Sequence, residues 1–422
     1  MAFDDFHCVV LGNEPAGLWL LNQLDKAYRA QGETPKLGWV GVGEEPGPVC
    51  VPASLCSSLG MGSTSASWSA EICTPKRSFR WSQDSVADHF AQLPPMEKAR
   101  DPLECLIAPS PQDRQAIEKA IAVRPDLIGF GRGLWKALGR TQNVSPQNAV
   151  HFLRFFTELQ WWNPVQELPA SVERLQLSAT ENRLESFESL RGGAVALQFK
   201  DLPRVSSKRW VMNLSQRSLF ELVGKKPEFL KMLNVHWEPA ALQALYPLRL
   251  TTEAAAIPVP VPALTLCFDT EMVPEPATQV WPLTLKHAPQ GRELTLWTTA
   301  PALVSLEAVL DTFRVGMQRV HSLFPFLSSR LLQTSVALGM ESCFSEEQRR
   351  QVADRLQSDS VEVYSQTGFY TETRHSAVSL LLPHMGCHLP YPVGSVLAAR
   401  KMLQTLVPKK KKAAAPEPTL HA

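Results

Sequence analysis

The sequence has almost no net charge and no long apolar segment. Its 422 residues include 42 Lys and Arg against 41 Asp and Glu, which leaves no overall field to attract nucleic acid or an acidic membrane surface. No apolar run approaches the roughly 20 residues that a membrane-spanning helix needs. The acidic start, Met1–Asp5, does not resemble the basic start of a secretory signal. We therefore expect a cytoplasmic protein with no nucleic-acid partner and no integral membrane segment.

The eight cysteines form no Cys-x-x-Cys pair and no Cys/His group with zinc-finger spacing. His384, Cys387 and His388 lie close together, but neighbouring prolines and a glycine exclude a helical face that would bring the two imidazoles together. We expect reduced, mostly buried thiols and no metal site.

The stretch CVVLGNEPAGLWLLNQL, residues 8–24, predicts a strand, a tight turn and a helix. A short apolar run ends at Gly12, and a helical pattern of leucines follows Gly17. These two residues occupy the first and third glycine positions of the Gly-x-Gly-x-x-Gly turn of dinucleotide-binding folds. The middle glycine position is Glu14.

The turn keeps the glycines that shape the fold and loses the glycine that serves a ligand. The N-terminus of a helix offers N–H groups and a positive dipole end to a pyrophosphate. The carboxylate of Glu14 opposes such a ligand unless it turns away or is neutralised. Pro15 suits a first helical turn but removes one N–H donor, and Ala16 completes the turn. The residues alone leave open whether this turn holds a dinucleotide or is the remnant of one that did.

Residues 36–43, KLGWVGVG, predict a second buried strand that ends at Glu44 and Glu45. An acidic residue at this place would accept hydrogen bonds from ribose hydroxyls, whereas the alternative is a solvated turn. Glu44 lies 32 residues after Gly12, which is farther than the spacing of about 20 usual for the motif.

The remaining pattern alternates between helical and strand-like segments. Residues 51–70 predict either a loop packed against a ligand or a connector, and 84–160 predict helices. Further helices are expected over 216–247 and 305–322. Strands are expected at 173–179, 194–199, 208–214, 264–269, 292–299, 334–340 and 361–368.

A second informative stretch, MGCHLPYPVGSVLAARKMLQTL, occupies residues 385–406. Gly386 and Gly394 flank a Pro-Tyr-Pro turn, and apolar residues then recur at three- and four-residue steps. The small Ala398 and Ala399 would let this helix approach another backbone closely.

Together the two ends resemble the two-domain FAD-dependent oxidoreductases of the amine oxidase and phytoene desaturase type. Gly394, Ser395 and the two alanines that follow match the family's C-terminal helix motif, and KRWVMNL, ending near Asn213, looks like its return strand. The resemblance implies that the N-terminal unit holds the ADP half of FAD and that the C-terminal helix points at the flavin ring. The cofactor-binding residues that it implies are Gly12, Glu14, Pro15, Ala16, Gly17, Glu44, Glu45, Gly386, Gly394 and Ser395.

The expected fold class is α/β, with a Rossmann-like FAD/NAD(P)-binding domain that is discontinuous in sequence and a mixed α+β substrate domain. The first domain is expected to comprise 1–80, 165–235 and 375–408. The substrate or cap domain comprises 81–164 and 236–374, and 409–422 is expected to be a disordered tail.

The function that the resemblance implies is flavin-dependent oxidation, in which FAD accepts hydride from a C–N or C–C bond of a small or apolar substrate. Tyr364, Phe369 and Tyr370 are candidates for a wall over the flavin ring, and the alternative is that they are core aromatics. No side chain stands out as a catalytic base. Two alternatives remain open: a scaffold or binding protein that has lost FAD, and an NAD(P)-binding enzyme. The sequence does not indicate the substrate or the oligomeric state.

Overall fold

The computed structural model describes most of the chain except several segments, the longest of them at 89–104, 337–368 and 408–422. The continuous parts are 3–43, 45–62, 109–139, 145–155, 159–177, 183–214, 243–257, 264–268, 280–288, 290–301, 306–336, 377–381 and 392–407, with shorter pieces between 64 and 105 and at 219–229, 235–237 and 369–371. The expected tail at 409–422 and the expected strand at 361–368 lie outside the described residues.

A five-stranded parallel sheet joins segments that are far apart in the sequence. Its order is β21-β13-β2-β3-β9, and every neighbouring pair is parallel. The strands are β2 (Cys8–Leu11), β3 (Leu37–Val42), β9 (Val172–Leu177), β13 (Trp210–Met212) and β21 (Val378–Leu380). This sheet confirms the predicted Rossmann-like α/β class.

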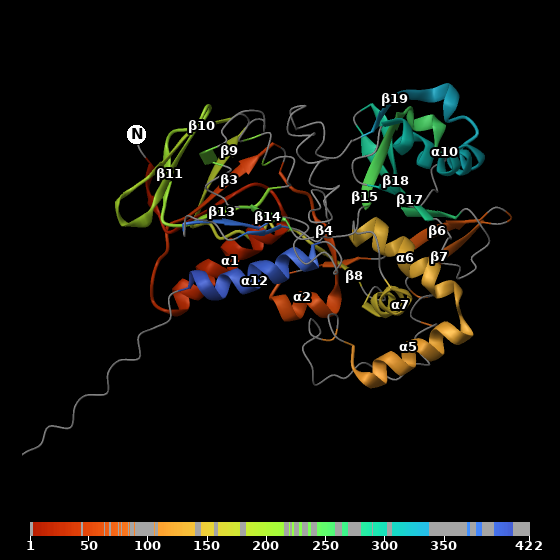
Figure 1. The fold of residues 1–422 in the computed structure, drawn as a ribbon, viewed down its shortest axis with the longest axis horizontal. Coiled ribbons are helices and arrows are strands. Elements are labelled where there is room, and N and C mark those ends of the chain that lie inside the picture. Colours follow the sequence, from red (N-terminus) through yellow and green to blue (C-terminus); the bar gives the residue numbers. More distant parts are fainter. Residues whose placement is uncertain are drawn as a thin grey trace, which may run out of the picture.

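Both faces of the parallel sheet are covered, which explains why the central strands β2, β3 and β13 are buried throughout. On one face, Val10 and Trp39 pack against α1 (Pro15–Ala30) and α12 (Val393–Leu406), which lie side by side in Figure 1. On the other face, Val9 and Val40 belong to a second core with a four-stranded sheet. The strands of that sheet are β1 (Phe3–Phe6), β12 (Val205–Ser207), β11 (Val195–Phe199) and β10 (Leu184–Ser189).

A seven-stranded sheet forms the second large unit, on the right of Figure 1. Only β6 and β16 pair in parallel, and the other pairs are antiparallel. In spatial order the strands are β19 (Leu331–Val336), β15 (Gln243–Thr252), β18 (Gly291–Pro301), β17 (Val280–Ala288), β16 (Leu264–Phe268), β6 (Ser69–Cys73) and β7 (Ser78–Ser82). Residues 69–82 thus pair with this sheet, although the expected first domain extends to residue 80.

Helices cover the seven-stranded sheet on two sides. The helix α10 (Leu306–Leu323) packs Phe313 and Val320 onto one core. Around β16 and β17, a different core includes Phe130 and Leu153 from the α5–α7 helices. These helices are α5 (Pro111–Val123), α6 (Asp126–Gly139) and α7 (Pro146–Phe155).

A small sheet and several short elements complete the described parts. The order of the small sheet is β4-β8-β5. Its elements and the helix beside it are β4 (Val49–Pro52), α2 (Ala53–Leu59), β5 (Thr64–Ala66) and β8 (Leu159–Trp162). The remaining pieces are β14 (Val235–Trp237), which pairs with β20 (Phe369–Thr371), and the 3₁₀ turns Arg191–Gly193, Ala254–Ala256 and Ser328–Arg330.

The prediction of a helix throughout 216–247 is wrong at its C-terminal end. Residues 235–237 form β14, and β15 begins at Gln243. The leucines of this stretch recur at helical spacing, but β15 pairs with β18 over its full length and with β19 over part of it. Pairing on both edges outweighs local helix preference.

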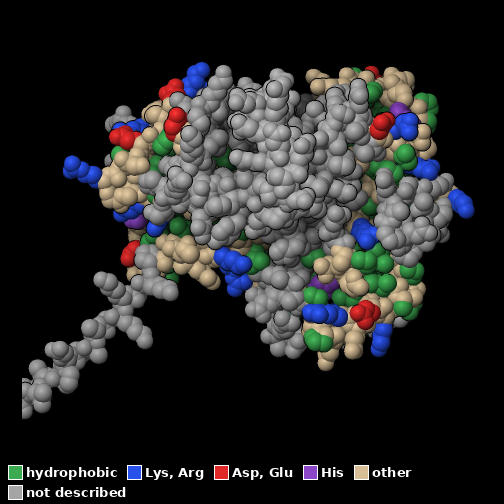
Figure 2. Space-filling model, viewed as in Figure 1, with side chains coloured by type: hydrophobic (Ala, Val, Ile, Leu, Met, Phe, Trp, Pro, Cys, Tyr) green, Lys and Arg blue, Asp and Glu red, His purple; other side chains and the backbone are tan. Residues whose placement is uncertain are grey.

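In the described part of the chain, no helix has both the length and the apolar character required to cross a membrane. On the face shown in Figure 2, the described Lys/Arg and Asp/Glu side chains are scattered in small groups of both signs.

Candidate functional site

The turn between β2 and α1 is held by backbone and side-chain hydrogen bonds from the neighbouring strand. Gly12 has a φ of 119°, a conformation that glycine adopts without a Cβ penalty. Its N–H donates to the Val40 carbonyl at 2.8 Å. The indole N–H of Trp39 donates to the Gly12 carbonyl, also at 2.8 Å. The turn is therefore fixed to β3 on both sides of Gly12.

Asn213, the residue after β13, fills the inside of this turn. It is fully buried, and its N–H donates to the Leu11 carbonyl at 2.7 Å. Its side-chain amide donates to the Glu14 carbonyl. A Cβ on Gly12 would lie 2.0 Å from the Asn213 carbonyl oxygen, and a Cβ on Gly17 would lie 2.2 Å from its Nδ2. The two predicted glycines are thus required by the close approach of β13 to the turn.

Asn13 ties the turn to the end of β3. Its side-chain amide donates to the Val42 carbonyl at 2.7 Å, and the Val42 N–H donates back to Asn13 Oδ1 at 2.9 Å. On the next strand, the Gln176 side chain donates to the carbonyl of Gly43. These side chains add hydrogen bonds at the carboxyl edge of the sheet, between the turn, the end of β3 and β9.

The turn lies at the point where the strand order of the sheet reverses. From β2 the chain passes through α1 to β3 on one side, whereas β13 and β21 lie on the other side. In open α/β sheets the crevice for a ligand forms outside the carboxyl ends of the strands at such a point. The N-terminus of α1, with its positive dipole end, faces this edge.

The N-terminus of α1 carries its own acidic residue. Glu14 is the N-cap, with φ −72° and ψ 140°, and its side chain makes no capping hydrogen bond. A carboxylate at this position is favourable for the helix dipole and unfavourable for a nearby phosphate. Pro15 is the first helical residue, and Ala16 and Gly17 are buried. The turn therefore offers a dinucleotide the positive end of a helix dipole, and Glu14 is the feature that opposes one.

Asn213 also leaves a hydrogen-bond acceptor unused. Its Oδ1 is buried and makes no hydrogen bond within the described part of the chain. Buried polar atoms are normally satisfied. An acceptor beside the turn suits a hydroxyl group of a ligand better than a phosphate oxygen.

The other predicted cofactor residues lie in two places. Glu45 is exposed after the end of β3, and Glu44 lies outside the described residues. Gly394 and Ser395 are buried in the first turn of α12. The Ser395 hydroxyl donates to the Pro392 carbonyl at 2.8 Å, so it stabilises the helix start. Gly386 falls outside the described part.

The predicted aromatic wall is described only in part. The backbones of Phe369 and Tyr370 belong to β20, opposite Trp237 and His236 of β14. Tyr364 lies outside the described residues. Among those that the structure describes, no group of three His, Cys, Asp or Glu side chains could hold a metal ion.

Glu167 is a partly buried acid beside α1 that the sequence did not indicate. Its Oε2 accepts a hydrogen bond from the Asn22 side chain of α1 at 3.2 Å. Burial raises the pKa of the Glu167 carboxyl, and its hydrogen bonds and Lys26 only partly oppose that effect. Glu167 therefore favours its neutral form more than a free glutamate does.

The helices α5 and α7 are joined by a buried ion pair. Arg154 Nη1 and Asp113 Oδ1 are 2.9 Å apart, and both side chains are only 6% exposed. Burial by itself would raise the pKa of Asp113, but the Ser110 hydroxyl and Arg154 outweigh it and hold the pKa below its ordinary value. The Ser110 hydroxyl also caps α5 by accepting the Asp113 N–H.

Comparisons with known proteins show only a weak similarity of the overall fold to solved structures. No protein-family model matches the sequence, and no curated protein matches it either. Solved structures of similar outline include a putrescine oxidase bound to putrescine (10% identity, 96% of this chain and 100% of that chain, TM-score 0.42). A second is cyclohexylamine oxidase from Brevibacterium oxydans IH-35A (12% identity, 96% of this chain and 99% of that chain, TM-score 0.41). A third is the flavin-dependent monooxygenase PieE in complex with FAD and substrate (11% identity, 96% of this chain and 58% of that chain, TM-score 0.41).

Proposed function

We propose that the chain is a flavoprotein that binds FAD at the carboxyl edge of its parallel sheet and acts as an oxidoreductase. The observation that supports this most is the turn from Gly12 to Gly17. It lies where the strand order reverses, it begins with a glycine at positive φ, and it leads into a buried helix.

The residues proposed to hold FAD are the turn, the acidic residues after β3 and the first turn of α12. The turn and the N-terminus of α1 would face the pyrophosphate. Glu44 or Glu45, after β3, would accept hydrogen bonds from ribose hydroxyls, and the first turn of α12, with Gly394 and Ser395, would face the flavin. When bound, FAD supplies the capacity to accept hydride from a C–N or C–C bond of a small or apolar substrate. Phe369 and Tyr370, with Tyr364, are the proposed wall beside that substrate.

We also propose that the two large sheets have different functions. The parallel sheet with α1 and α12 would hold the cofactor, and the seven-stranded sheet with its helices would serve as the substrate part. Segments 165–235 and 375–408 contribute β9, β13, β21 and α12 to the first part.

A second candidate function is that of a scaffold or binding protein without FAD. Glu14 favours it, because the positive end of α1 already has a carboxylate of this chain beside it. The close approach of Asn213 also explains why glycine is needed at positions 12 and 17 even when no ligand is bound.

The absorbance spectrum of the purified full-length chain distinguishes the two functions. The flavoprotein function predicts a yellow protein that releases flavin on denaturation, or a colourless protein that takes up one equivalent of added FAD. NAD(P)H added in the same way should not bind. A colourless chain that takes up no FAD would favour the scaffold instead.

A further inference from the structure

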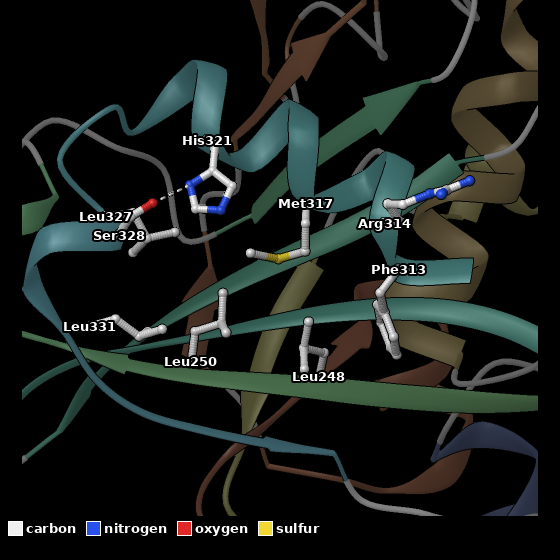
Figure 3. Close-up of a pocket in the computed structure, with 9 residues that line it drawn as sticks. All are labelled: Leu248, Leu250, Phe313, Arg314, Met317, His321, Leu327, Ser328 and Leu331. Carbon is white, nitrogen blue, oxygen red and sulfur yellow. Dashed lines mark hydrogen bonds between the residues drawn. The ribbon is translucent and has the colours of Figure 1, made fainter. Parts of the chain in front are cut away.

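A cavity far from the parallel sheet lies between α10 and the edge of the seven-stranded sheet. Its volume is about 320 Å³, within the range of small-molecule sites. It is lined by Leu248, Leu250, Phe313, Arg314, Met317, His321, Leu327, Ser328 and Leu331 (Figure 3). This site is separate from the one proposed for FAD and does not depend on it.

The body of the cavity is apolar. In Figure 3, Met317 projects from α10 toward Leu248 and Leu250, which project back from β15. Phe313 is buried against the same core. Leu331, on the edge strand β19, lines the cavity and is 38% exposed. An apolar chain that enters past Leu331 is removed from water inside.

The polar groups of the cavity are cationic or neutral. Arg314 and His321 are seven residues apart on α10, so they lie on one stripe about 10 Å apart along the helix. No carboxylate is among the nine lining residues. In Figure 3 the Arg314 side chain extends away from the cavity centre, whereas the His321 ring faces the space between helix and strands. A lining with cationic and neutral polar groups favours an anionic ligand over a cationic one.

Ser328 orients the His321 ring. Its Oγ lies 3.1 Å from His321 Nδ1. When the hydroxyl donates to Nδ1, the ring carries its proton on Nε2, and a charged ring also has a proton there. In both cases Nε2 can donate a hydrogen bond into the cavity.

We propose that this cavity binds a small apolar monocarboxylate of the size of a medium-chain fatty acid. Its apolar chain lies among Leu248, Leu250 and Met317. Its carboxylate accepts a hydrogen bond from His321 Nε2, and Arg314 adds a favourable field without direct contact.

Calorimetric titration of the full-length chain with octanoate tests the proposal, with octanol as the probe that lacks the carboxylate. We expect one octanoate to bind per chain and octanol to bind more weakly. His321→Asn should weaken octanoate about tenfold, because a charge-assisted hydrogen bond is lost, and should weaken octanol less, because its hydroxyl accepts only a neutral hydrogen bond. Ser322→Ala is the matched control: Ser322 follows His321 on α10 but carries no charge and does not line the cavity, so octanoate binding should not change.

A second variant tests the preference of the cavity for an anion. Leu331→Glu adds a carboxylate at an exposed position of the lining, which should not impair folding, and it should weaken octanoate more than octanol by repulsion. Three results would each overturn the proposal: no octanoate binding at millimolar concentration, equal binding of octanoate and octanol, or octanoate binding that neither variant changes.

Discussion

Gly17 and Asn213 are in direct contact, although 195 other residues separate them in the sequence. The side-chain amide of Asn213 lies 2.2 Å from the point where a Cβ on Gly17 would be. This amide also donates to the carbonyl of Glu14. The contact thus joins β13 to the first turn of α1.

Gly17→Ala should destabilise the fold by roughly 2–4 kcal/mol, because the added methyl meets a buried amide that is itself hydrogen-bonded. Urea unfolding measures the change. Gly47→Ala is the control, since a Cβ at Gly47 meets nothing within 4 Å. In the Asn213→Ala background the cost of Gly17→Ala should fall, which a double-mutant cycle detects. Equal costs in both backgrounds would contradict the contact.

Asp113→Asn should cost about 3 kcal/mol, because it leaves Arg154 buried without its counter-charge. The pKa of Asp113 is below its ordinary value of 3.8. The stability that this carboxylate contributes is therefore present above pH 3.8 and is lost as the pH falls through the lower folded value. Unfolding curves from pH 7 to pH 2 should converge for the wild type and the variant.

The control for this prediction is the exposed pair of Arg204 and Glu188, whose side chains are 46% and 62% exposed. Glu188→Gln should change stability by less than about 1 kcal/mol at any pH. A similar loss of stability in both variants would show that burial does not increase the contribution of the Asp113–Arg154 pair.

Glu167→Gln should stabilise the chain at neutral pH, by an amount on the order of 1 kcal/mol, because the amide carries no charge to bury. Burial raises the pKa of Glu167 above 4.5. An acid with a raised folded pKa contributes stability below its unfolded pKa, and that contribution is lost as the pH rises through the folded value. The advantage of the variant should therefore be absent well below pH 4.5 and should appear as the pH rises through the folded value. An advantage that does not vary with pH would rule out the titration of this carboxyl as its cause.

Glu14→Gly should tighten FAD binding about tenfold if the turn holds the pyrophosphate, because a repulsive carboxylate is removed. The Glu14 carbonyl that accepts from Asn213 is kept. Quenching of flavin fluorescence on titration measures the affinity. Glu33→Gly, which removes an exposed acid at the other end of α1, should have no such effect. Weaker binding in the Glu14 variant would show that the carboxylate contacts the cofactor productively.

The sequence predicted the part of the fold that depends on local pattern. Apolar runs bounded by glycine and polar residues located β2, β3 and β13, and helical spacing located α1 and α12. The structure shows that these strands share one parallel sheet.

What the sequence could not predict depends on contacts between distant segments. Asn213 was recognised only as the end of a strand, because nothing local indicates that its side chain would enter the turn of Gly12. The glycines of α6 were not singled out either. A Cβ on Gly131 would lie 2.4 Å from the Ala149 carbonyl of α7, so this glycine is needed for helix packing.

The order in which the parallel sheet is assembled has a consequence for synthesis on the ribosome. β21 pairs with the outer edge of β13, but its residues are made about 165 positions later, which corresponds to roughly 10–30 s of translation. During that interval β13 has an unpaired edge, which is a template for association with other chains. Newly made chains should therefore depend on chaperones more than their final stability would indicate, and slower translation of the second half should increase aggregation in the cell.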